Sequence, residues 1–163
     1  IYREVYEVNF CYLRRLVSSL VMPATITFCG YNRRTRLARP AVEWFVSTFL
    51  PRYHLIIDII DKGLNREGLY GSCSICDNCY RPREFVIEMN NTIDDDLYLV
   101  TLFHELIHVK QRVLGQHKTK YQKDYWFGKF IDPDTSYRDL PYEVEAHQME
   151  ESVTALYLSE RPL

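Results

Sequence analysis

The chain has 163 residues and a mass of 19.5 kDa, which is the size of one domain, and we expect a single domain over residues 1–163. Hydrophobic residues make up 47% and charged residues 26% of the chain, which excludes a disordered or collagen-like protein. The 20 basic and 22 acidic residues give a net charge of −2, which disfavours a nucleic-acid partner, and no apolar run reaches the roughly 18–20 residues that span a bilayer.

The N-terminal part of the chain predicts a helix followed by a strand. Apolar residues recur at helical spacing over residues 2–20, which predicts an amphipathic helix that ends before Pro23. Residues 25–31 are rich in β-branched and aromatic side chains, as is typical of a short strand. Residues 32–39 carry four arginines, and we interpret them as a solvated loop, with a patch for an acidic partner as the alternative.

A second helix and two further strands are expected in the middle of the chain. Pro40 is typical of a first helical turn and predicts a helix over residues 41–49. Residues 53–61 predict a strand. Residues 83–89 alternate charged with apolar side chains, which predicts a strand with one buried face.

A long helix is predicted over residues 95–114. Thr92 or Asp94 is placed to cap its first turn, where acidic residues suit the helix dipole, and Gly115 is a natural C-terminal stop. Residues 116–141 show no regular pattern, and we expect them to be irregular.

A last helix is predicted from Pro141 to about residue 158. Helices before and after a small sheet, without regular alternation of strands and helices, indicate an α+β domain.

The long helix carries an HExxH motif at residues 104–108. His104 and His108 are one helical turn apart, so both imidazoles can reach one metal ion. Glu105 lies about 100° round the helix from His104, where it can contact a water molecule at the metal without being a ligand itself. The motif therefore predicts a metal site with Glu105 as the catalytic base.

The rest of the helix agrees with this interpretation. Its apolar residues lie on the side opposite the two histidines, between roughly 140° and 220° from His104. They are Leu99, Leu102, Leu106, Val109 and Val113. A helix that is buried by one face and presents His104 and His108 from the other suits a metal-binding site.

A catalytic zinc takes three protein ligands and keeps one open position, so a third ligand must come from elsewhere. The extended HExxHxxGxxH type would have Gly at position 111 and His at position 114. The chain has Gln111 and Leu114 there, which excludes that class.

Residues 140–147 (LPYEVEAH) follow on the last helix, and here the sequence resembles the gluzincin metallopeptidases, in which HExxH is followed by an ExxA or ExEA helix. The resemblance implies that Glu143 is the third ligand of one Zn²⁺ and that Ala146 is the small residue packed against the motif helix. His147 takes a place often held by Asp, either beside a ligand or as a ligand. Glu145 is the competing carboxylate, but it points about 200° away from Glu143 on a helix.

The pieces RPREF (residues 81–85), HExxHxxQ (104–111) and PYEVEA (141–146) together resemble compact single-domain metallopeptidases of phages and bacteria. The likeness covers residues 80–150 and implies a minimal zincin-like domain with a small mixed sheet. In zincin folds an edge strand binds the extended peptide substrate by strand addition. The resemblance places that edge at Arg83, Glu84, Phe85, Val86, Ile87, Glu88 and Met89.

The reaction that follows from this reading is hydrolysis of a peptide bond by a metal-activated water, whose proton Glu105 accepts and returns to the leaving amine. The oxyanion needs a further donor. The sequence offers four candidates for that donor or for a contact beside the metal, His147, Tyr142, Tyr137 and Arg112.

Residues 116–141 separate the two ligand-bearing helices and should border the site. They carry basic residues and a run of aromatic residues at 125–127, which predicts a lid or wall that favours acidic or aromatic substrates. A loop that packs its aromatic side chains on the core is the alternative.

Two other functions remain open from the sequence. SprT-like DNA-associated proteases use HExxH with a third histidine, for which His117 is the candidate, although Gly115 should end the helix first. A non-catalytic zinc-containing binding module would keep the metal and act through its surface.

The five cysteines are an odd number, which disfavours a disulfide framework. The cluster Cys73, Cys76 and Cys79 could join Cys11 or Cys29 in a structural metal site, but we favour a cysteine-rich hairpin tip between two strands. No signal-peptide pattern is present, and we expect a reducing, cytoplasmic location.

Overall fold

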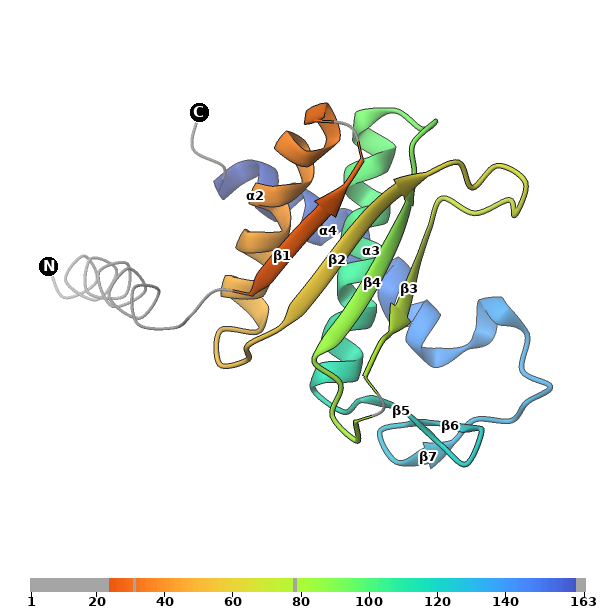
Figure 1. Cartoon of the computed structure of the whole chain (residues 1–163). Helices are drawn as coiled ribbons and strands as arrows, with labels where there is room; N and C mark the ends of the chain where they lie inside the picture. The colour runs from red at the N-terminus through yellow and green to blue at the C-terminus, as the bar shows by residue number, and fades with distance from the viewer. Residues whose placement is uncertain (1–23, 31, 78, 161–163) are drawn as a thin grey trace, which may run out of the picture.

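The computed structural model describes residues 24–160 except residues 31 and 78, and the helix expected over residues 2–20 lies outside the described residues (Figure 1). The strands are β1 (Thr25–Cys29), β2 (Ile56–Lys62), β3 (Gly71–Ile75), β4 (Glu84–Asn90), β5 (His117–Lys120), β6 (Lys123–Trp126) and β7 (Lys129–Phe130). The helices are α2 (Asn32–Phe49), α3 (Asp95–Val113), the 3-10 helix η1 (Tyr137–Asp139) and α4 (Pro141–Glu160). None of the described helices is long and apolar enough to cross a membrane.

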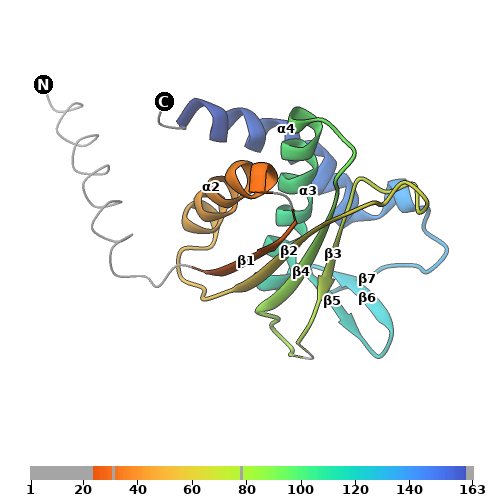
Figure 2. The ribbon, with the colours of Figure 1, turned by 45° about the horizontal axis from the view of Figure 1, so that its top comes forward.

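The larger sheet is mixed and has the strand order β1-β2-β4-β3. β1, β2 and β4 run parallel, whereas β3 is antiparallel to β4, with Gly71 opposite Met89. Helices α2, α3 and α4 lie on one side of this sheet (Figure 2). The predicted α+β class with a small mixed sheet is therefore confirmed.

The strand order corrects one prediction. Residues 83–89 were expected to form the substrate-binding edge, but β4 lies between β2 and β3, so its backbone groups are paired on both sides. The edge strand on this side of the sheet is β3. Its sequence, GSCSI, lacks the alternation of apolar and polar residues that marks a strand, because an edge strand with small residues buries little apolar surface.

Alternate side chains of the central strands form the core with the helices. Ile57 and Ile59 of β2 and Phe85 and Ile87 of β4 are buried against the apolar side of α3. Burial of these side chains fixes the position of α3 on the sheet, and with it the position of the HExxH motif that α3 carries.

Helix α2 begins nine residues before the predicted start, so residues 32–39 are helical rather than a loop, and Pro40 lies inside the helix. Ala38 is as fully buried as Ala41, so the apolar stripe continues for a turn before the proline. This burial offsets the hydrogen bond that a proline removes from a helix.

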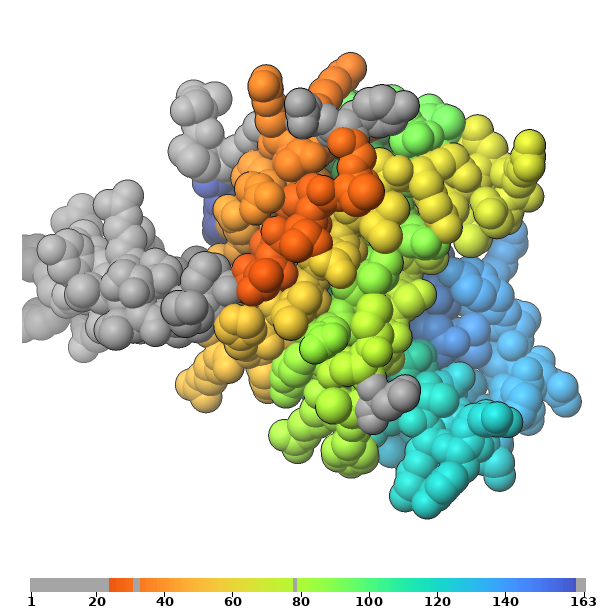
Figure 3. Space-filling model, in the orientation of Figure 1, coloured from red at the N-terminus to blue at the C-terminus, as the bar shows by residue number. Residues whose placement is uncertain are grey.

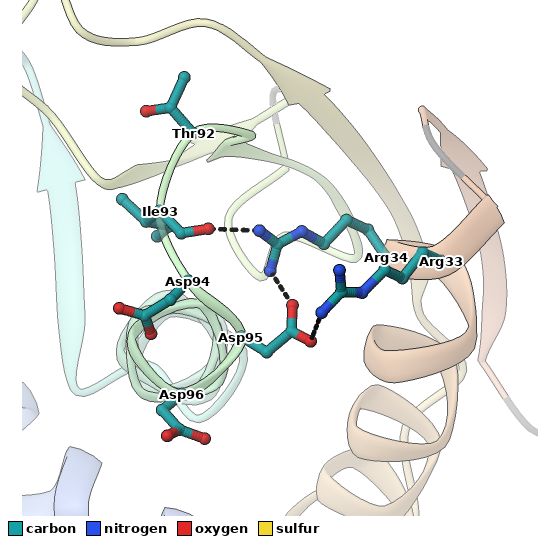
Figure 4. Close-up of a pocket in the computed structure, with 7 residues that line it drawn as sticks. All are labelled: Arg33, Arg34, Thr92, Ile93, Asp94, Asp95 and Asp96. Carbon is teal, nitrogen blue, oxygen red and sulfur yellow. Dashed lines mark hydrogen bonds and ion pairs between the residues drawn. The ribbon is translucent and has the colours of Figure 1, made fainter.

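Ion pairs at the start of α2 tie it to the start of α3 (Figure 4). Arg33 and Arg34 both reach the Asp95 carboxylate, at 2.5 and 2.6 Å, and Arg34 also donates to the Ile93 carbonyl. The arginines of the predicted loop therefore fix the relative position of two helices.

Residues 116–141 are more regular than expected. Strands β5, β6 and β7 form a separate antiparallel sheet, and η1 precedes α4. The turn between β5 and β6 consists of Tyr121 and Gln122, both with positive φ (52° and 59°). Asn-Gly or Asp-Gly is the usual signal for such a turn, and its absence concealed the hairpin in the sequence.

Candidate metal centre

Helix α3 buries the apolar side that its sequence predicts, and the side that carries the motif is largely buried as well. Its apolar stripe (Leu99, Leu102, Leu106, Val109 and Val113) is buried. Asp94 is the N-cap and accepts a hydrogen bond from the Leu97 amide at 2.9 Å. Gly115 follows the helix with φ of 71°, a conformation that suits glycine. Since both ends are fixed, the motif residues are held in register over the sheet.

The three predicted ligands converge. His104 Nε2 lies 3.1 Å from His108 Nε2 and 3.3 Å from Glu143 Oε2, and His108 Nε2 lies 3.5 Å from Glu143 Oε1. Ligand atoms bound to Zn²⁺ at 2.0–2.1 Å in tetrahedral geometry are about 3.3 Å apart. The spacing of these donor atoms is therefore in the range of ligands around one metal ion, with a different Glu143 oxygen nearest to each histidine. His104 and Glu143 also form a group with His147 that could hold a metal ion, in which the ligand atoms all lie within 4.8 Å of one another.

Helix α4 brings Glu143 to the histidines. The helix begins at Pro141, and the amide of Glu143 donates to the Leu140 carbonyl at 3.0 Å in its first turn. Ala146, three residues later, is fully buried in the core that α3 and α4 share. A small side chain at that position lets the two helices approach closely enough for Glu143, itself only 5% exposed, to reach the histidines.

The electrostatics of the centre favour a charged carboxylate between the histidines. Burial alone would raise the pKa of Glu143, but hydrogen bonds from His104, His108 and Tyr137 hold it well below its usual range. Burial lowers the pKa of His104, yet the contact with Glu143 and the charges of Glu105 and Glu150 raise it overall. The site is thus built to stabilise positive charge at its centre.

Each histidine is oriented by a second contact. His104 Nδ1 is 2.7 Å from Glu150 Oε2, so this nitrogen can donate to the carboxylate while Nε2 faces His108 and Glu143. Glu150 was not among the predicted site residues. It lies seven residues after Glu143, two helical turns along the same face of α4, and this periodicity is the signal that could have identified it.

Gln111 orients the second histidine. Its Oε1 lies 2.9 Å from His108 Nδ1, and its Nε2 donates to the Tyr142 carbonyl and to Glu145 Oε2, both at 2.9 Å. Gln111 is fully buried, so these are the partners that replace water. Glu145 therefore supports His108 through Gln111, while Glu143 faces the metal position.

Glu105 lies against the edge strand. It is 6% exposed, and its pKa is raised by burial and by the charges of Glu143 and Glu150, against the opposing charges of the two histidines. A Cβ at Gly71 of β3 would lie 2.8 Å from Thr101 Cγ2 and 3.0 Å from Glu105 Oε1. Glycine at this position therefore allows β3 to pass directly over the carboxylate.

The four candidates for a further donor separate into two pairs. The Tyr137 hydroxyl donates to Glu143 Oε2 at 2.9 Å, and the His147 ring lies 4.7 Å from the His104 ring. Tyr142 instead stacks on His117, and Arg112 donates to Thr119. Tyr137 and His147 are thus at the centre, and Tyr142 and Arg112 lie to its side.

His117 does not join the two motif histidines. It is 5% exposed, stacks on Tyr142 at 3.9 Å and lies 3.3 Å from Asp124 Oδ1. Among the described residues, the group with metal-ligand spacing that contains a motif histidine is completed by Glu143 and His147, both from α4. The third histidine of an SprT-like centre is therefore not found at His117.

The cysteine cluster belongs to the hairpin between β3 and β4, as predicted. Cys73 lies within β3, whereas Cys76 and Cys79 are exposed beyond its end. Burial and the charge of Glu105 raise the pKa of Cys73, which keeps its thiol protonated. Asp77 holds the hairpin by accepting from the amides of Arg83 and Glu84, and no cysteine joins a metal-ligand group in the described part of the chain.

Comparisons with protein-family models, with curated proteins and with solved structures gave no match to this chain. The geometry of the centre is therefore the basis on which a function can be assigned.

Proposed function

We propose that the protein is a zinc-dependent peptidase in which His104, His108 and Glu143 hold one ion. The observation that carries this proposal is the 3.1–3.5 Å spacing of their donor atoms. Bound there, Zn²⁺ would polarise a substrate carbonyl and lower the pKa of a water molecule towards neutrality.

Glu105 is the proton carrier in this proposal. It is buried beside the ligands without being needed to complete them, and its raised pKa brings its carboxylate closer to the pH at which it works. A Glu105 oxygen accepts a proton as water attacks the carbonyl carbon, and it then donates the proton to the leaving amine.

The free edge of β3 is the proposed substrate site. An extended peptide could add to this edge as a further strand, through main-chain hydrogen bonds. Gly71 brings the edge against Glu105, so a peptide paired with β3 would lie next to the proton carrier. This assignment replaces the edge expected at residues 83–89.

Tyr137 is the proposed donor to the developing oxyanion. Its hydroxyl already lies within hydrogen-bonding distance of Glu143, while the residue is 62% exposed. Burial of the hydroxyl and its bond to Glu143 raise the pKa of Tyr137, so the phenol stays protonated. Its one proton is donated to Glu143 in this structure, and in the proposed reaction it turns to the oxyanion.

The substitution Glu105→Gln tests the proposal, with Glu151→Gln on the exposed side of α4 as the matched control. The wild type should bind one equivalent of zinc and cleave unfolded casein. Glu105→Gln should keep the zinc and lose about a hundredfold to ten-thousandfold in rate, whereas Glu151→Gln should behave as the wild type. Full cleavage by Glu105→Gln would remove Glu105 from the role of proton carrier, and zinc binding by the wild type without any cleavage would instead favour a binding module.

A further inference from the structure

The β5–β7 sheet presents one face that is entirely basic and aromatic. Directly paired residues share a face of a sheet, and the pairs here are Lys118 with Tyr125, Tyr125 with Phe130, and Lys120 with Lys123. Three lysines and two aromatic rings therefore stand together on this face.

The opposite face is directed towards the molecule and holds the acidic residue of the sheet. His117 is buried against Tyr142, and Asp124 accepts from Thr119 at 2.5 Å while it contacts His117. Residues 117–130 contain four lysines and one aspartate, a local charge of 4 − 1 = +3 in a chain whose net charge is −2.

The basic face carries two unfavourable features at the same end. Lys120 and Lys123 are directly opposite each other, and like charges in that position destabilise a hairpin. The turn that joins them places Tyr121 and Gln122 in the left-handed region that favours glycine, and Tyr121 is 85% exposed. An anionic ligand would relieve the repulsion between the two lysines.

These lysines contact aromatic groups rather than carboxylates. Lys118 donates to the Tyr80 hydroxyl at 2.9 Å, and Lys123 lies 5.7 Å from the centre of the Phe130 ring. None of the three lysines of this face forms an ion pair with a described residue. The face therefore has unneutralised positive charge beside exposed apolar surface, since Tyr80 and Phe130 are 72% and 51% exposed.

The face adjoins the proposed substrate edge. The hydrogen bond between Lys118 and Tyr80 joins β5 to the hairpin that follows β3. The stack of His117 on Tyr142 joins β5 to the start of α4, next to Glu143. In the space-filling view the β5–β7 segment lies beside that hairpin and projects from the body of the molecule (Figure 3). A peptide that follows β3 past Ile75 would run towards the lysines.

We propose that Lys118, Lys120 and Lys123, with Tyr80 and Phe130, bind an acidic segment of the polypeptide substrate beside the bond to be cleaved. The inference rests on the proposed peptidase function and specifies its substrate class. Strands β5 and β6 have four residues each, about 13 Å, which matches a short peptide segment. A nucleic acid is the weaker fit, because the acidic chain offers no extended field for a phosphate backbone.

The test compares two fluorescein-labelled peptides that differ only in a run of four residues, Glu in one and Gln in the other. Binding to zinc-loaded Glu105→Gln protein is measured by fluorescence anisotropy. In that background we compare Lys120→Gln/Lys123→Gln with Arg36→Gln/Arg66→Gln, a control that removes two exposed positive charges elsewhere. The Glu peptide should bind more tightly than the Gln peptide, and its advantage should shrink as salt is added.

The lysine variant should lose about fivefold to tenfold in affinity for the Glu peptide, and its melting temperature should not fall, because a like-charge pair has been removed. Equal binding of the two peptides, an equal loss in the arginine variant, or tighter binding of single-stranded DNA of the same charge would overturn the proposal. Cleavage of both peptides by the wild type without a charge preference defeats this inference alone. Lysine-dependent binding without any cleavage defeats the peptidase proposal alone.

Discussion

The metal centre and the β5–β7 sheet differ in how their polar groups are partnered. In the centre each histidine has an acceptor for Nδ1, Glu150 for His104 and Gln111 for His108. In the sheet Lys120 and Lys123 face each other, and neither forms an ion pair with a carboxylate of the described residues. The contrast indicates that the centre is organised before anything binds, whereas the basic face is left incomplete for a partner.

If the centre is organised in this way, the largest effect should come from removing a ligand. Glu143→Ala should abolish stoichiometric zinc binding, because the site loses one of three donors and its negative charge. Glu145→Ala is the control two residues away and should retain most of the zinc, measured by atomic absorption after dialysis. Retention of zinc by Glu143→Ala and its loss from Glu145→Ala would reverse the ligand assignment.

The contact of Gln111 with His108 predicts a smaller loss of zinc affinity when Gln111 is changed. Gln111→Glu keeps an acceptor for His108 Nδ1 but places a second carboxylate against Glu145 and the Tyr142 carbonyl. Zinc affinity, measured by competition with a chelator, should fall about tenfold to a hundredfold.

Adding Glu145→Gln to Gln111→Glu should recover most of that affinity. The amide would then donate from position 145 to the new carboxylate, so the hydrogen bond is restored with its direction reversed. Glu145→Gln alone should have little effect, because an amide oxygen can still accept from Gln111. If the double variant is as weak as Gln111→Glu, the pair does not act as a unit.

Local periodicity explains why α3 could be predicted from the sequence and β3 could not. The apolar stripe of α3 and the placement of His104 and His108 are set by residues within a few turns of one another. The position of β3 outside β4 depends on strand pairing between distant residues, and the short GSCSI strand carries no pattern of its own. Glu143 was inferred from a motif, whereas Glu150 lies outside the motif and is marked only by its seven-residue spacing from Glu143.

The hairpin of β5 and β6 was missed for a different reason. Its turn uses Tyr121 and Gln122 in a backbone conformation that sequence rules reserve for Gly, Asn and Asp. Pro40 is the opposite case, because a proline there predicts the start of a helix whereas α2 extends through it from Asn32. At Pro40, the burial of Ala38 in the core outweighs the local preference.

The close passage of β3 over α3 predicts a loss of stability of intermediate size. Gly71→Ala places a methyl group 2.8 Å from Thr101 Cγ2, and overpacking of this kind costs about 1–3 kcal/mol. Urea unfolding should show this decrease in the free energy of unfolding. Thr101→Ser removes the opposing methyl group, so Gly71→Ala/Thr101→Ser should be more stable than Gly71→Ala. If the double variant is no more stable, the contact with Thr101 Cγ2 is not the cause of the lost stability.

The smallest effect should appear in the dependence of stability on pH, at the junction of the two regions. Burial and the charge of Arg112 lower the pKa of His117 to about 4, against the opposing charge of Asp124. The unfolded chain therefore takes up a proton at His117 as the pH falls below about 6.5, while the folded protein does not. Its contribution to stability is present at pH 7 and decreases between pH 6.5 and 4.

The size of this contribution between pH 7 and pH 5 is about 1–2 kcal/mol. Urea unfolding at the two pH values isolates it as the difference in pH dependence between the wild type and His117→Gln. Glutamine can still donate to Asp124 but does not titrate, so the variant should lose less stability on acidification than the wild type. An identical pH dependence in the two proteins would mean that His117 is protonated in the folded state. The buried ring of His117, stacked on Tyr142, would then carry a charge in the folded protein.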